Sequence, residues 1–112
     1  MYSYDEIMQF VYIIVEVANP DRVILFGSYA YGNPSETSDL DILVIKNDEV
    51  LSRDERAELA LEIFDKRMQR QMKMRYDLFI RTDKEVVETA ETGGAFVDAM
   101  LKGRVVYERA SY

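Results

Sequence analysis

Residues 39–45 read Asp-Leu-Asp-Ile-Leu-Val-Ile, so two acidic side chains open an otherwise continuous apolar run. The run is short and rich in β-branched residues, which predicts a strand over residues 40–45 that is covered on both faces. Because successive side chains of a strand point to opposite faces, Asp39 and Asp41 project to the same side. Ionised carboxylates are costly in such a setting unless they are paired or bind a metal.

Repulsion between Asp39 and Asp41 indicates a cation site. At ~5 Å and an effective dielectric constant of ~20, two like unit charges repel by about 3 kcal/mol. A divalent cation turns that cost into attraction, and hard oxygen ligands select Mg²⁺ or Mn²⁺. The alternative is that both acids lie in a solvated turn beside Ser38, but a turn does not explain the apolar run that follows.

A third acid, Asp77, lies inside another apolar segment, residues 76–80, which we predict to be a strand. If this strand lies beside residues 40–45, Asp77 completes a cluster of three carboxylates. Such a cluster can hold one or two metal ions and activate an attacking hydroxyl. The alternative is an ion pair between Asp77 and Arg75 or Arg81, which would also offset the cost of burying the acid.

Helix and strand patterns alternate along the rest of the chain. Apolar spacing and a capping box of Ser3 and Glu6 predict a helix over residues 3–18, although β-branched residues in its second half favour a strand. This order predicts an α/β (α+β) fold, with helices packed on one sheet in a single domain over residues 1–112. The other predicted elements are strands at 22–26 and 105–107 and helices beginning near Ser52, Thr82 and Gly94.

The helix that begins near Ser52 is predicted to be long and amphipathic. A capping box of Ser52 and Glu55 opens it. Basic residues gather in its last part. Their role is either to complement the helix dipole or to bind a partner. The apolar positions expected to face the core are Ala57, Ala60, Leu61, Phe64, Met68 and Met72, and the basic residues are Lys66, Arg67, Arg70, Lys73 and Arg75.

Gly27 and Ser28 directly follow the strand at 22–26. Glycine at this point lets the backbone approach a ligand closely. Ser28 is placed to begin a helical turn whose N–H groups and hydroxyl face an anion. The alternative is a plain turn, and Gly32 has the same two interpretations.

The composition narrows the chemistry that is available. The chain has neither cysteine nor histidine, which excludes thiol catalysis, thiolate metal sites and histidine bases. A net charge of −7 disfavours binding to nucleic acid through phosphate contacts. The longest apolar runs are too short to span a membrane, and no signal peptide is visible, so we expect a cytoplasmic protein.

Together these motifs resemble a known family. Gly27-Ser28, ten further residues and then Asp39-Leu40-Asp41 is similar to the Gly-Ser…Asp-x-Asp signature of the DNA polymerase β-like nucleotidyltransferase superfamily. Residues 26–32 and 38–44 look like its minimal nucleotidyltransferase (MNT) branch, and Asp77 falls where that family carries its third acid. The resemblance implies a nucleotidyltransferase fold with a mixed β-sheet and helices packed on it.

The resemblance also implies roles for individual residues. Asp39, Asp41 and Asp77 would be the catalytic and metal-binding residues, with Mg²⁺ or Mn²⁺ as the cofactor and ATP as substrate. Asp77 would also help to deprotonate the acceptor hydroxyl, while Gly27 and Ser28 would bind the phosphates of the nucleotide.

By the same resemblance, the protein would be an antitoxin that transfers AMP from ATP to a tyrosine of a HEPN-domain toxin. Relatives often carry arginine where this chain has Tyr29 or Tyr31, which favours an alternative in which the protein neutralises its partner by contact alone. A third alternative is transfer to a small molecule, with dimerisation building the substrate site. The sequence leaves homo-oligomerisation open.

Overall fold

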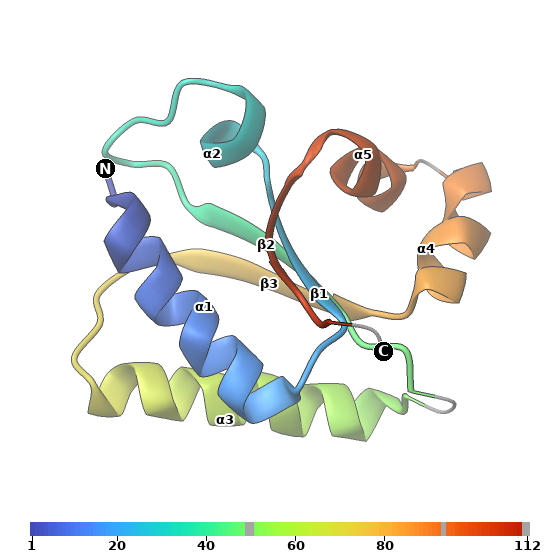
Figure 1. Ribbon diagram of the computed structural model, residues 1–112, viewed down its shortest axis with the longest axis horizontal. Helices are drawn as coiled ribbons and strands as arrows, with labels where there is room; N and C mark the ends of the chain where they lie inside the picture. Colours follow the sequence, from blue (N-terminus) through green and yellow to red (C-terminus); the bar gives the residue numbers. More distant parts are fainter. Residues whose placement is uncertain (49–50, 93, 111–112) are drawn as a thin grey trace.

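The computed structural model describes residues 1–48, 51–92 and 94–110, and its four strands form one mixed sheet (Figure 1). The spatial order is β3-β2-β1-β4. β1 pairs antiparallel with both β2 and β4, whereas β2 and β3 are parallel. The predicted strands and the mixed sheet are therefore confirmed, with bounds β1 Arg22–Phe26, β2 Leu40–Ile45, β3 Tyr76–Arg81 and β4 Arg104–Glu108.

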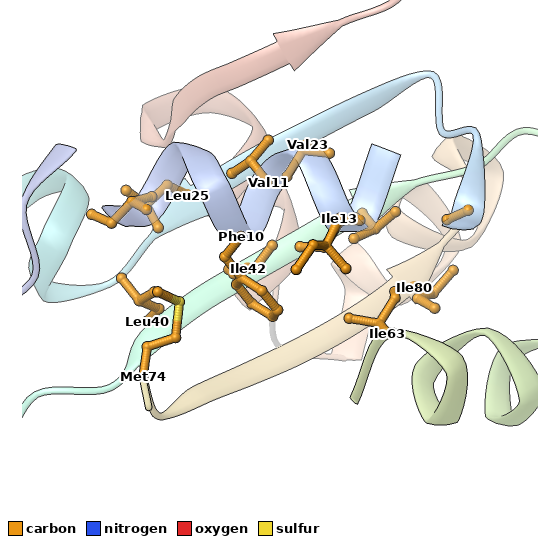
Figure 2. Close-up of a cluster of buried hydrophobic side chains, with 14 of the residues drawn as sticks. Phe10, Val11, Ile13, Val23, Leu25, Leu40, Ile42, Ile63, Met74 and Ile80 are labelled. Atoms are coloured by element: carbon orange, nitrogen blue, oxygen red, sulfur yellow. The ribbon is translucent and has the colours of Figure 1, made fainter. Parts of the chain in front are cut away.

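Helices cover both faces of the sheet, as the uniformly apolar β2 requires. α1 (Tyr4–Ala18) and α3 (Arg53–Gln69) lie on one face, and α4 (Asp83–Glu88) and α5 (Ala95–Lys102) lie on the other (Figure 1). On the first face, Phe10 and the neighbouring residues of α1 pack on apolar residues of three strands (Figure 2). The described elements also include the short helix α2 (Ser28–Tyr31) and a 3₁₀ turn at Thr89–Thr92.

The caps predicted from the sequence form largely as expected. Ser3 and Glu6 make both bonds of a capping box at the start of α1, and Asn19 ends this helix in the left-handed conformation. Thr82 and Glu85 make a second complete capping box at α4. At α3, Ser52 accepts a hydrogen bond from the backbone N–H of Glu55.

The prediction of which side of α3 packs against the core is wrong for most of the residues that it named. Ala57, Leu61, Phe64 and Met68 are exposed, Ala60 is half-buried, and Met72 packs against the core but lies beyond the helix end. Ile63 is the buried residue instead. The face that carries Ile63 also carries two arginines that bind backbone carbonyls: Arg56 donates to the oxygens of Leu51 and Ile80, and Arg67 donates to those of Met72 and Met74.

α3 also provides the crossover between β2 and β3. Parallel strands cannot be joined by a tight turn, so a connection of this length is needed to bring the chain back in the same direction. The crossover sets β3 beside β2 with Asp41 opposite Asp77. None of the helices in the described ranges is long and apolar enough to cross a membrane.

Candidate active site

The three predicted acids lie at one end of the sheet. Asp39 immediately precedes β2, Asp41 is the second residue of β2, and Asp77 is the second residue of β3. In the parallel register Asp41 pairs with Asp77, and across the antiparallel register it pairs with Phe26, the last residue of β1. The sheet therefore brings Asp77 beside Asp41, next to the point where the chain leaves β1 for Gly27.

Asp41 is the acid whose ionisation the fold opposes most clearly. Burial raises the pKa of the Asp41 carboxyl above its usual range, and the charge of Asp77, a hydrogen bond with Asp77 and the charge of Asp39 raise it further. In the described part of the chain, no cationic side chain forms an ion pair with Asp41 or Asp77. Two adjacent carboxylates without a cation have the chemistry of a divalent-metal site.

Asp39 has a different partner. Its Oδ1 atom lies 3.1 Å from Nε of Arg75, and the same guanidinium donates to the backbone carbonyl of Thr37. In this arrangement, no three acidic side chains among the described residues are grouped closely enough to bind one metal ion. Asp41 and Asp77 are the two acids that would hold a divalent cation, and Asp39 would join them only by exchanging Arg75 for the metal.

The solvated turn describes Asp39, which directly follows a turn and is 43% exposed, but it does not describe Asp41. Asp41 lies in a strand, although a turn at residues 35–38 does precede Asp39. Arg75 pairs with Asp39 instead of Asp77. Arg81 donates to the carbonyl of its neighbour Ile80 and lies 5.5 Å from the ring centroid of Phe96.

The position of the Asp41 side chain requires glycine at residue 27. Its φ of +71° with ψ of −152° is a backbone conformation that is essentially restricted to glycine. A Cβ atom built on Gly27 would lie 2.1 Å from Oδ2 of Asp41. The absence of a side chain thus lets the Asp41 carboxylate occupy this position, which adds a second reason for glycine to the ligand approach predicted from the sequence.

Ser28 begins α2, as predicted. The backbone N–H groups of Ala30 and Tyr31 both donate to the carbonyl of Gly27, at 3.1 and 3.2 Å, and Gly32 closes the turn on the carbonyl of Ser28. The half-buried Ser28 therefore lies on the first turn of a short helix, one residue after Gly27, which closely approaches the Asp41 carboxylate.

Tyr29 has a structural role that its position in the motif does not reveal. Its ring stacks on Tyr2 with centroids 5.9 Å apart, and its hydroxyl accepts a hydrogen bond from the Tyr2 backbone N–H. The Tyr2 hydroxyl in turn accepts one from the backbone N–H of Arg75 at 2.9 Å. Tyr2 and Tyr29 thereby connect α2 to the start of β3.

Arg75 is the residue of this site that sequence reasoning misplaced. The sequence places Arg75 either in the basic end of the helix that begins near Ser52 or beside Asp77 as an ion-pair partner. A signal was available, because Arg75 lies two residues before Asp77 and strand side chains repeat with a period of two. The side chain of Arg75 is 58% exposed, so its guanidinium is a cation at the mouth of the site.

Comparison with known proteins identifies the family of this chain. Residues 7–107 match the family model described as the nucleotidyltransferase domain. The chain belongs to this family. A candidate nucleotidyltransferase from Sulfolobus solfataricus has a similar crystal structure, with a TM-score of 0.54 over 96% of this chain and 91% of that one.

At 18% sequence identity, the Sulfolobus structure supports the fold alone. No protein of curated function shows a significant match to this chain. The nucleotidyltransferase family supports a transferase activity, and its members generally use a nucleoside triphosphate and a divalent metal.

The raised pKa of Asp41 predicts a pH-dependent gain in stability on substitution. Above the usual pKa range of aspartate, the native nucleotidyltransferase holds Asp41 ionised at a cost that the unfolded chain does not bear. We expect Asp41→Asn to raise the melting temperature of the metal-free protein at pH 7. The gain should disappear below about pH 4, where aspartate is protonated in the unfolded chain as well.

Thermal melts in EDTA between pH 3 and pH 8 measure this effect. Asp98→Asn, at an exposed position of α5, is the matched control and should change the melting temperature little. The same Asp41→Asn protein should also lose the stabilisation that Mg²⁺ plus ATP gives to the wild type. A ligand-induced shift of equal size in the two proteins would rule out Asp41 as a metal ligand.

Proposed function

We propose that this nucleotidyltransferase transfers AMP from ATP to a tyrosine hydroxyl of a HEPN-domain toxin and thereby acts as a cytoplasmic antitoxin. The observation that carries the proposal is the pairing of Asp41 with Asp77 across parallel strands, directly beside Gly27 and Ser28. This pairing supports a metal-dependent transfer, and the acceptor is inferred from the resemblance of the motifs to the MNT branch.

In the proposed reaction, the acceptor oxygen attacks the α-phosphorus of ATP. The bond between that phosphorus and the oxygen that bridges to the β-phosphorus breaks, and diphosphate leaves. Asp77 takes the proton of the hydroxyl. Asp39, Asp41 and Asp77 would hold Mg²⁺ or Mn²⁺, which would neutralise charge on the phosphates.

The position of Asp77 supports a large acceptor. β3 is an edge strand of the described sheet, and Asp77 is exposed on it. A protein surface can approach such an edge, whereas a small molecule would have few surrounding groups to bind it. The net charge of −7 also favours a partner with basic surface, which an RNA-cleaving toxin needs for its own substrate.

The second candidate is neutralisation by contact without catalysis. Two observations favour it: Asp39 is paired with Arg75, and Tyr29 is occupied in joining α2 to Tyr2. In this reading the fold is retained as a binding module while Asp39 is not available to a metal.

Intact-mass spectrometry of a co-expressed HEPN toxin separates the two candidates. We expect a mass increase in units of AMP with the wild type and none with Asp39→Asn, while Asp98→Asn should behave as the wild type. A toxin that stays unmodified and is inhibited equally by the wild type and by Asp39→Asn would refute catalysis as the mechanism and support contact alone.

A further inference from the structure

The outer side of α3 carries a line of exposed apolar residues. Leu61 is 60% exposed, Met68 is 55% exposed and Phe64 is 42% exposed. With Ala57, they follow a spacing of four, three and four residues, which places them on one side of a helix. We call Ala57, Leu61, Phe64 and Met68 the α3 stripe, and it faces away from the side on which Ile63 is buried.

Unpaired carboxylates run along one flank of the α3 stripe. We call this set of exposed side chains the acidic ridge. At 3.6 residues per turn, Asp54, Glu58 and Asp65 lie directly beside the stripe. In the part of the chain that the structure describes, no member of the ridge forms an ion pair. The ridge consists of Asp54, Glu55, Glu58, Glu62 and Asp65.

The opposite flank of the stripe offers little compensating charge. Arg56 is already bound to Glu85 at 2.6 Å. Arg67 donates to backbone carbonyls, and its guanidinium lies 5.1 Å from the ring centroid of Phe64. Arg53 is the exposed arginine that remains on this flank, among the residues described.

The stripe continues towards the candidate active site. The Arg67 guanidinium also lies 5.3 Å from the ring centroid of Tyr76, at the start of β3. A hollow of about 390 Å³ is lined by Phe64, Arg67, Arg75 and Tyr76, among others, and Arg75 binds Asp39. In Figure 1, a short loop leads from the end of α3 to the start of β3.

We propose that the α3 stripe and the acidic ridge form a docking surface for a basic amphipathic helix of a partner protein. Apolar residues of that helix would cover Leu61, Phe64 and Met68, and its lysines or arginines would pair with the ridge. Burying the exposed apolar side chains supplies the driving force for association, and the unpaired carboxylates select a basic partner.

A second copy of the chain fits this surface poorly. If two α3 helices packed antiparallel through their stripes, each acidic ridge would face the other ridge. If they packed parallel, the ridge would face the opposite flank, where Arg53 and the half-buried Arg67 are the cations without an acidic partner among the described residues. Five carboxylates against the charges of Arg53 and the half-buried Arg67 leave most of the negative charge uncompensated, so the surface favours a different, basic protein.

Docking on the stripe would place the partner next to the hollow that leads to Arg75 and Asp39. That the docked partner is also the acceptor of AMP rests on the proposed function, whereas the docking itself does not depend on catalysis.

The test uses a synthetic 17-residue helical peptide, which matches the length of α3. Its leucines follow the same spacing and its lysines and arginines flank them, and a scrambled peptide of equal composition is the control. Fluorescence anisotropy should show that Leu61→Ser weakens binding at least tenfold. Leu101→Ser, at a position of α5 that is 77% exposed, should leave the affinity within about twofold.

Charge reversal tests the ridge separately. Glu58→Lys combined with Asp65→Lys should weaken peptide binding at least tenfold, and Glu108→Lys on β4 should not. Wild-type binding should also weaken as salt is added. Equal binding of the scrambled peptide, no binding of the designed one, or a wild-type dimer that Leu61→Ser dissociates would each overturn the proposal.

Asp77→Asn separates docking from the proposed function, because Asp77 lies outside the stripe and the ridge. Its affinity for the peptide should equal that of the wild type, and loss of that affinity would contradict the assignment of the surface. Intact docking by a wild type that transfers no AMP to any protein would support the surface and refute the proposed reaction.

Discussion

Asp77→Asn should lower the rate of nucleotide transfer by about 10²–10⁴-fold, because it removes the carboxylate that we propose takes the proton of the acceptor hydroxyl. The affinity for ATP should change much less, since Asp77 is exposed on the edge strand β3 and its neighbour Asp41 remains to bind the metal. Single-turnover kinetics and nucleotide titration measure the two effects separately.

Ser28→Ala is the matched comparison for this experiment. We propose that the hydroxyl of Ser28 donates a hydrogen bond to the triphosphate of ATP. Its removal should therefore weaken ATP binding by ~1–2 kcal/mol, the value of a hydrogen bond to a charged group. Transfer at saturating ATP should remain. If Asp77→Asn lost all nucleotide binding while Ser28→Ala bound ATP normally, the two role assignments would be wrong.

Gly27→Ala should both destabilise the protein and abolish transfer. An alanine at φ +71° would be strained by about 1–3 kcal/mol. Its Cβ would also lie 2.1 Å from Oδ2 of Asp41, so the carboxylate must move away from Asp77. Denaturant unfolding measures the first effect, and a nucleotide-transfer assay measures the second.

Gly32→Ala is the control, because it adds the same methyl group five residues away. Its φ of −131° is open to any residue, and the nearest atom to the added Cβ would be 3.4 Å away. We expect a small change in stability and retained transfer. An unfolding midpoint for Gly27→Ala that equals the wild-type midpoint would show that the backbone relaxes at this turn and that the close approach of Asp41 is not required.

The strands and the acid pair could be predicted because their signals are local. β1 and β2 are short, continuous apolar runs, and their observed bounds coincide with those runs. The side-by-side placement of Asp41 and Asp77 depends on a parallel register that a sequence does not specify by itself. It could be anticipated because both acids are second in their strands and each is out of place among apolar neighbours.

The burial of α3 could not be predicted from hydrophobic spacing, because the helix has two apolar faces. The longer apolar line is exposed, whereas Ile63 packs in the core and Arg56 and Arg67 of the same face bind backbone carbonyls. These hydrogen bonds join α3 to backbone carbonyls outside the helix, and the positions of those carbonyls are set only by the complete fold. The pairing of Arg75 with Asp39 depends in the same way on the turn before β2.

The place of β4 in the sheet has a consequence for synthesis on the ribosome. β1 lies between β2 and β4, but β4 is the last strand of the described chain to be translated. Until residues 104–108 emerge, the nascent chain presents one edge of the apolar β1 without its hydrogen-bonding partner. Unpaired apolar edges are templates for intermolecular strand pairing, so aggregation of this protein is most favoured during that interval of translation.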